Sequence, residues 1–191
     1  MSNAIEVTKN GDRVVVRFTR PDVRNRLSIS VVKELTVIVD KIGRNASVRE
    51  VVLTGTGDAF ASGANLREIA SLKAADAKEF ALLGQTLMQK IEDLPQATTA
   101  MINGYCFGGG LDLALACDRR ITTQNATFCH PGVGLGIITG WGGTQRLPRL
   151  IGEGNALKLF LTAEPIAAEE ALRIGLIDGI KDAFQFETEF R

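Results

Sequence analysis

The chain has 191 residues, enough for one domain with a substantial core and too few for two ordinary ones, so we expect a single domain over residues 1–191. The formal net charge is zero and no apolar run is long enough to cross a membrane, which excludes a broad nucleic-acid-binding surface and a transmembrane segment. The three cysteines form no C-x-x-C pair and the N-terminus is unlike a signal peptide, so we expect buried thiols and a reduced cytoplasmic location. With a single histidine, no metal site is expected.

The first part of the chain predicts a hairpin, a helix and a strand. Residues 5–8 and 13–18 flank Asn10-Gly11, a dipeptide suited to the positive φ of a tight turn. Apolar residues recur at helical spacing between residues 31 and 42. The run 51–54 then predicts a short buried strand, stopped by glycine.

The remainder alternates in the same way. A helix over residues 80–94 ends before Pro95, since proline cannot continue it. The later elements are a strand at 98–102, an apolar helix at 111–117, short extended pieces at 120–123 and 127–128, and helices at 156–161 and 167–174. The recurring order of strand, strand and helix predicts an α/β fold with helices packed on stacked sheets.

A glycine-rich stretch over residues 103–114 reads N-G-Y-C-F-G-G-G-L-D-L-A, where a strand ends and an apolar helix begins. Glycines there allow a ligand to approach the backbone, and the free N–H groups of the first helical turn favour negative charge. This is the chemistry of an oxyanion site. A tight turn without a ligand is the alternative, whereas phosphate binding is weaker because neither G-x-x-x-x-G-K-[ST] nor G-x-G-x-x-G is present.

Several stretches, taken together, resemble the crotonase (enoyl-CoA hydratase/isomerase) superfamily. Residues 60–66, F-A-S-G-A-N-L, resemble its F-x-x-G-A-D-[LI], and residues 103–114 resemble its N-G-x-x-x-G-G-G-x-E-L-A. Residues 142–147 resemble its G-G-T-Q-R-L, residues 20–27 its R-P-x-x-x-N-x-L, and residues 175–178 its G-L-V-x. The resemblance implies a spiral of strand-strand-helix (ββα) units.

The family assembles as homotrimers or hexamers, and its C-terminal helical segment is expected to be shortened or missing in this chain. We therefore expect an oligomer that covers apolar side chains such as Leu157, Phe160 and Phe184.

The resemblance also implies a site for an acyl-CoA thioester. The thioester oxygen would lie between the backbone N–H groups of Ala64 and Gly109. Of the two glutamates that hold water in the hydratases, the first corresponds to Asp112, one methylene shorter, and the second to Gly132, which has no side chain. A displacement of about 1 Å is enough to cost on the order of a hundredfold in rate, so the acid/base apparatus is expected to differ from that of the family.

Three further residues lie near this altered position. His130 stands two residues before Gly132, either as a base that holds water or as a structural histidine. Trp141 is either a core residue or a wall of the acyl pocket. Thr139 falls near the place of an aspartate in naphthoate synthases, which resemble this chain in having a glycine at position 132.

Contacts with CoA are implied for five residues: Arg24, Arg26, Ala61, Asn65 and Arg67. Arginine suits phosphate, although a solvated surface charge is the alternative for each one. CoA would be part of the substrate, so no separate cofactor is expected.

The resemblance thus predicts an acyl-CoA-processing lyase or isomerase of the enoyl-CoA hydratase type, with Asp112 as the acid/base and His130 as a candidate partner. Other crotonase chemistry stays open, namely thioester hydrolysis, decarboxylation or naphthoate-synthase-like ring closure. A catalytically degenerate paralogue that only binds acyl-CoA is the third alternative.

Overall fold

The computed structural model describes residues 4–182, which form two β-sheets with helices packed around them. The larger sheet has the strand order β1-β2-β3-β5-β7-β10, and its strands are Ile5–Asn10, Arg13–Phe18, Glu50–Thr54, Ala97–Ile102, Arg119–Thr123 and Gly179–Lys181. The smaller sheet has the order β4-β6-β8-β9, formed by Ala59–Ala61, Tyr105–Phe107, Thr127–Cys129 and Ile166–Ala167. Only the β1–β2 and β8–β9 pairs are antiparallel, and the other pairs of these strands are parallel.

The chain winds as a spiral between the two sheets. In each of the pairs β3–β4, β5–β6 and β7–β8, the first strand joins the larger sheet and the second joins the smaller one. The α-helices are α1 (Ile29–Gly43), α2 (Leu66–Ser71), α3 (Ala77–Glu92), α4 (Gly109–Leu115), α5 (Gly143–Ile151), α6 (Glu153–Thr162) and α7 (Ala168–Arg173). The 3₁₀ helices are η1 (Pro21–Val23), η2 (Ala74–Asp76) and η3 (Pro131–Leu135). The predicted α/β fold of ββα units is therefore confirmed.

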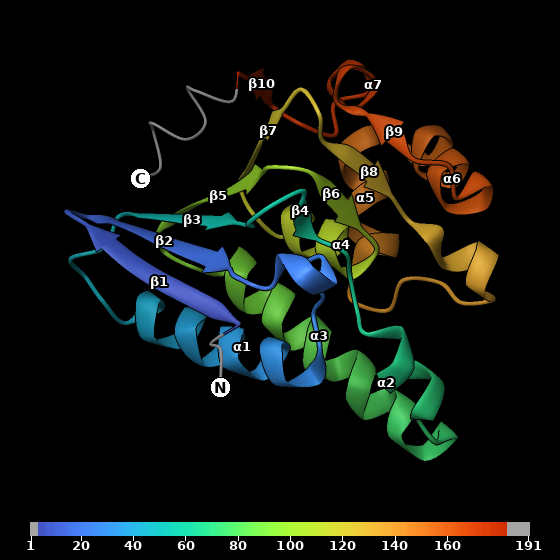
Figure 1. Cartoon of the computed structure of the whole chain (residues 1–191), viewed down its shortest axis with the longest axis horizontal. Coiled ribbons are helices and arrows are strands. Elements are labelled where there is room, and N and C mark those ends of the chain that lie inside the picture. The colour runs from blue at the N-terminus through green and yellow to red at the C-terminus, as the bar shows by residue number, and fades with distance from the viewer. Residues whose placement is uncertain (1–3, 183–191) are drawn as a thin grey trace.

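Helices α1 and α3 lie side by side on one face of the larger sheet (Figure 1). Their buried faces present Leu35, Leu87, Met88 and Ile91 to the main core, which explains the helical spacing of apolar residues in the sequence. The helices α5, α6 and α7 gather beyond the smaller sheet, while α2 and the start of α3 project at one end (Figure 1).

Two asparagines fix the turn that leads into β4. Asn25 is 2% exposed, and its side chain donates to the carbonyls of Thr56 and Ala59 at 3.1 and 2.7 Å. Asn103 also donates to the Ala59 carbonyl, at 3.1 Å, and accepts from the Gly55 N–H at 3.0 Å. Because buried polar groups need such partners, these two motif residues hold β4 in place.

Several simpler expectations can also be compared with the structure. Cys106, Cys117 and Cys129 are buried and unpaired, as predicted. Among the described residues, no helix combines the length and apolar character needed to span a membrane. Leu157 is 56% exposed and Phe160 is partly buried, whereas Phe184 lies outside the described residues.

Candidate active site

A cavity of about 350 Å³ lies between the α2–α3 end of the molecule and the segment that joins β8 to α5. Its lining includes Ala64, Gly109, Asp112, His130 and Thr139. The rest of the wall is mostly apolar and comes from α2, α3 and residues 135–141. A concave apolar site with a few convergent polar groups is typical of small-molecule binding.

Close backbone packing brings the two predicted amides together. A Cβ added at Gly63, which has a φ of +91°, would lie only 3.0 Å from the Gly109 nitrogen, and a Cβ added at Gly109 would lie 3.5 Å from the Ala64 nitrogen. A Cβ at Gly110 would lie 2.1 Å from the Ala61 carbonyl oxygen. The glycines are therefore required because the β4–α2 connection and the start of α4 approach each other without intervening side chains.

Neither amide is used by the fold. Among residues 4–182, no hydrogen bond from the Ala64 or Gly109 N–H to a backbone or side-chain acceptor is formed. Gly109 is the first residue of α4, and the N–H groups of a first helical turn have no intrahelical acceptor. Two N–H groups without an acceptor therefore belong to residues that line the same cavity.

Asp112 lies one turn further along α4, on the same face of the helix as Gly109. Its carboxyl group is 1% exposed, and Oδ2 accepts a short hydrogen bond from the Thr139 hydroxyl. Oδ1 has no hydrogen-bond partner among the described residues and lies 3.6 Å from Nε2 of His130, which is also buried and unpartnered. An added Cβ at Gly143 would lie 2.1 Å from Oδ1, so this glycine makes room for the carboxylate.

Burial shifts the pKa values of Asp112 and His130 in opposite directions. It raises the pKa of Asp112 to about 7, against the opposing effects of the Thr139 hydrogen bond and the charge of Arg146. Burial also lowers the pKa of His130 to about 4. In both residues desolvation favours the neutral form, so near pH 7 His130 is neutral and Asp112 is about half protonated.

Gly132 lines the same cavity as this pair. It occupies the position at which the resemblance leads one to expect a second carboxylate. A Cβ there would lie 2.6 Å from the Ile137 carbonyl oxygen, and the Ile137 N–H donates to the Gly132 carbonyl at 3.0 Å. The chain therefore folds back over Gly132 and leaves no room for a larger side chain. His130 supplies the second titrating group of the cavity instead.

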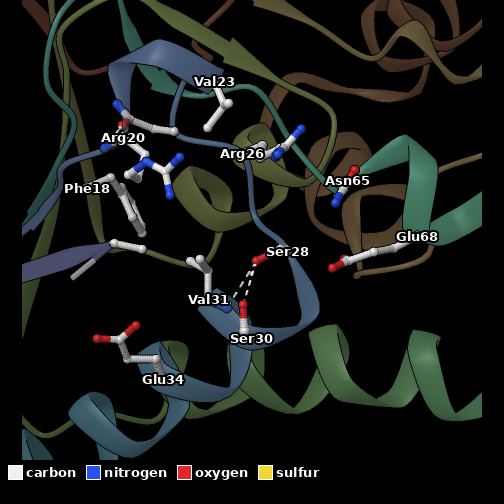
Figure 2. Close-up of a pocket in the computed structure, with 12 residues that line it drawn as sticks. Phe18, Arg20, Val23, Arg26, Ser28, Ser30, Val31, Glu34, Asn65 and Glu68 are labelled. Atoms are coloured by element: carbon white, nitrogen blue, oxygen red, sulfur yellow. Dashed lines mark hydrogen bonds between the residues drawn. The ribbon is translucent and has the colours of Figure 1, made fainter. Parts of the chain in front are cut away.

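The predicted CoA-contacting residues are separated by the structure. A second cavity, of about 460 Å³, lies on the other side of the β4–α2 connection and is lined by Arg26 and Asn65 (Figure 2). Asn65 caps α2, since its Oδ1 accepts from the Arg67 N–H at 3.2 Å, and Arg67 is exposed on that helix. The guanidinium of Arg24 points elsewhere, 4.4 Å from the centre of the Tyr105 ring.

Ala61 differs from the other predicted contacts because it is fully buried in β4 and lines neither cavity. Ala61 packs against Gly110 of α4, so it contributes to the packing of the fold and does not reach either cavity. Among the described residues, no group of three or more histidine, cysteine or acidic side chains is arranged to hold a metal ion.

Two interactions of the site were not foreseen from the sequence. Thr139 was singled out, but its hydrogen bond to Asp112 joins residues 27 positions apart, and no local signal marks it. Gly143 was recognised as part of a motif, but its role in making room for Asp112 was not. A glycine at the start of a helix that has no polar cap indicates that another group packs closely against the backbone there.

Comparison with known proteins agrees with these features. Residues 9–191 match the enoyl-CoA hydratase/isomerase family. The short-chain-enoyl-CoA hydratase of Clostridium acetobutylicum is 40% identical over 179 residues, which cover 93% of this chain and 69% of that protein. The crotonyl-CoA hydratase of Syntrophomonas wolfei is 41% identical over 177 residues, covering 92% of this chain and 68% of that protein. The chain spans just over two thirds of the length of either relative.

Among solved structures, an enoyl-CoA hydratase from Bacillus anthracis superposes with a TM-score of 0.93 at 38% sequence identity. The match covers 98% of this chain and 73% of that structure. The likeness therefore extends over nearly all of the described fold, including both walls of the cavity.

Proposed function

The chain belongs to the enoyl-CoA hydratase/isomerase family, and from that premise we propose that it is a hydro-lyase that adds water to, or removes water from, an acyl-CoA thioester. The observation that carries the proposal is the pair of unused amides of Ala64 and Gly109 at the wall of a cavity that also holds Asp112. CoA is part of the substrate in this proposal.

The two amides serve as the oxyanion hole. Both donate to the thioester oxygen, on which negative charge develops as the enolate forms. Removing one such donor typically costs roughly 3–4 kcal/mol of transition-state stabilisation. Since the donors are backbone groups fixed by close packing, no reorganisation is needed at the moment of reaction.

Asp112 and His130 move the protons. During addition, the oxygen of water bonds to Cβ while neutral His130 takes its proton, the carbon–carbon π bond breaks, and protonated Asp112 delivers its proton to Cα. The imidazolium and carboxylate that result then exchange one proton, which restores the pair. The proximity of the two unpartnered atoms, 3.6 Å apart, supports this division of roles.

Arg26 and Asn65 hold the CoA portion, because they line the cavity next to the connection that carries Ala64. Arg67 is exposed on the neighbouring helix α2 and adds a phosphate contact in this proposal. Arginine is suited to phosphate by its fixed fork of donors. Arg24 contributes more weakly in this proposal, since its guanidinium rests on Tyr105 and lies 4.0 Å from Asp58.

The protein is further proposed to form a homotrimer or hexamer in the cytoplasm. Apolar exposure supports association, since Ile138, Leu157 and Leu161 are 66%, 56% and 62% exposed. Three unpaired thiols are consistent with a reducing compartment. Light scattering would test the assembly, and a monodisperse monomer would contradict it.

Gly132 favours a second candidate function. A site with an oxyanion hole and only one carboxylate also suits thioester hydrolysis, in which water attacks the carbonyl carbon and CoA leaves as the thiol. The same pair would then take the proton of water and give it to the departing sulfur.

The two candidates are separated by incubating the protein with crotonyl-CoA and following the enoyl-thioester absorbance and free thiol in parallel. Hydration removes the absorbance without releasing thiol, whereas hydrolysis releases one thiol per turnover. Binding of acyl-CoA without either change would leave only a catalytically inactive binding protein.

A further inference from the structure

The indole of Trp141 is wedged between two helices at the wall of the cavity. A Cβ at Gly84 of α3 would lie 2.2–2.3 Å from Cδ1, Cδ2 and Cγ of the ring, and a Cβ at Gly109 of α4 would lie 2.6 Å from Cε3 and Cζ3. The side chain is 3% exposed. The ring therefore rests directly on bare helix backbone at both contacts, and any side chain there would displace it.

The Trp141 ring lies next to the point at which the acyl chain of a bound thioester would begin. Gly109 provides one of the two amides proposed to bind the thioester oxygen, and the acyl Cα is a single bond from that carbonyl carbon. The indole edge lies against the same Gly109, and Phe80 continues the wall with its ring centre 5.5 Å from that of Trp141. An acyl chain extending from the amides toward α3 must pass these two rings.

Two features of the arrangement are unfavourable for packing alone. Nε1 of Trp141 is buried without a hydrogen-bond partner among the described residues. A phenylalanine at this position would avoid the cost of burying that unpaired donor. Gly84 lies in the interior of α3, where alanine is a better helix former. Two unfavourable local features at the same Trp141–Gly84 contact are expected where function, rather than stability, determines the shape of the cavity wall.

We propose that Trp141 is a specificity-determining residue that limits the length of the acyl chain, so that the cavity accepts short acyl-CoA thioesters. The proposal rests on the proposed function only in placing the thioester oxygen at Ala64 and Gly109. Gly84 sets how deeply the indole withdraws from the cavity, although Gly84 itself lines neither cavity.

Opposite substitutions provide the test. Trp141→Ala widens the cavity, whereas Gly84→Ala pushes the indole toward it. Calorimetric binding of butyryl-, hexanoyl-, octanoyl- and decanoyl-CoA measures the preference without hydration, since these saturated thioesters have no double bond to hydrate. We expect Trp141→Ala to raise the ratio of octanoyl- to butyryl-CoA affinity by at least about tenfold, because each newly buried methylene adds favourable free energy. Gly84→Ala should lower the same ratio.

Two further measurements keep the test independent of folding. Trp141→Phe preserves an aromatic wall and should shift the ratio in the direction of Trp141→Ala, by less. Trp141 is the only tryptophan of the sequence, so its fluorescence reports on this wall directly. In the wild-type protein, butyryl-CoA should alter the emission while free CoA leaves it unchanged.

The proposal is overturned if all four proteins bind the series with the same length preference, or if butyryl-CoA binds without altering the Trp141 emission. Failure of the proposed function looks different. In that case the wild-type protein binds butyryl-CoA with the expected length preference but converts no enoyl-CoA, and the role of Trp141 stands. Absence of binding for every thioester would overturn both.

Discussion

Nε2 of His130 lies 3.6 Å from Oδ1 of Asp112, and neither atom has another polar partner in residues 4–182. The two residues come from different turns of the spiral, since Asp112 lies on α4 and His130 follows β8. A hydrogen bond of 2.8 Å from the Gly108 N–H to the Cys129 carbonyl joins these two turns immediately beside the pair. The backbone therefore fixes how closely the two titrating groups approach.

The first prediction concerns the pH dependence of hydration. Protonated Asp112 donates to Cα, so activity should be lost as pH rises through about 7, the pKa to which burial raises this carboxyl. Neutral His130 accepts from water, so activity should be lost as pH falls through about 4, its lowered pKa. The measurement is kcat/KM for crotonyl-CoA against pH, and a profile that keeps rising above pH 7 would contradict the assignment of the acid.

A matched variant checks which limb belongs to Asp112. The Thr139 hydroxyl stabilises the ionised carboxylate through its hydrogen bond, which lowers the pKa of Asp112. Thr139→Val removes this donor while keeping the shape, so the upper limb should move to higher pH and the lower limb should stay. If the lower limb moves instead, the roles of the two groups are reversed.

The second prediction is that the pair nearly cancels its own effect on stability. The raised pKa of Asp112 contributes stability at low pH that is lost as pH rises from about 4 to about 7. The lowered pKa of His130 contributes stability at high pH that is lost as pH falls from 6.5 to about 4. Since each pH unit of unequal proton binding contributes about 1.4 kcal/mol, the two trends are of similar size and opposite sign.

Single variants should expose each trend. Relative to the wild-type protein, Asp112→Asn should gain about 4 kcal/mol of unfolding free energy between about pH 4 and 7, and His130→Gln should lose about 3 kcal/mol over the same range. Urea unfolding at several pH values measures both, and comparison with the wild type removes the contribution of other groups. Parallel stability curves for all three proteins would show that the two side chains are not buried as described.

Much of the fold followed from local pattern and family resemblance. The Asn10-Gly11 turn and the apolar periodicity of α1 and α3 predicted elements that the structure contains. By contrast, β4 and β6 have three residues each and exist because they pair with one another. Such strands have too few residues to show an alternating pattern, so the smaller sheet was not predictable in detail.

The site was predictable where backbone geometry defines it and less so where side chains do. The motifs brought Ala64, Gly109 and Asp112 to one cavity, as expected from their order. The direction of Arg24 was not predictable, because its φ of +50° turns the side chain toward Tyr105. A left-handed arginine is uncommon, and nothing in the neighbouring sequence announces it.

The third prediction tests the placement of the Asp112 carboxylate. In Gly143→Ala, the new Cβ would lie 2.1 Å from Oδ1, so the carboxylate must move. We expect roughly a hundredfold loss of kcat, as for other displacements of about 1 Å, with little change in acyl-CoA affinity. Gly154→Ala in α6 is the control, because an added Cβ there meets no atom within 4 Å. Equal activity of the two variants would argue against a catalytic role for Oδ1.

The fourth prediction tests the paired amides. In Gly63→Ala, the Cβ would lie 2.8 Å from the Phe107 carbonyl oxygen and 3.0 Å from the Gly109 nitrogen, forcing the two backbone segments apart. Loss of one oxyanion donor typically lowers kcat by about 10²–10³-fold. Gly11→Ala introduces the same positive-φ strain in the β1–β2 turn, where no atom lies within 4 Å, and should keep full activity. Similar losses in both variants would point to general destabilisation, which thermal unfolding would reveal.

The fifth prediction separates the two arginines near the second cavity. Arg26 lines that cavity, whereas the guanidinium of Arg24 lies over Tyr105 and near Asp58, so Arg26→Ala should weaken CoA binding more than Arg24→Ala. Loss of one phosphate contact worth about 1.4 kcal/mol would raise KM for crotonyl-CoA about tenfold. The crotonyl thioester of N-acetylcysteamine lacks the nucleotide, so its KM should not respond to Arg26→Ala. A parallel rise for both thioesters would place Arg26 at the acyl end instead, and a larger effect of Arg24→Ala would mean that its side chain turns toward CoA on binding.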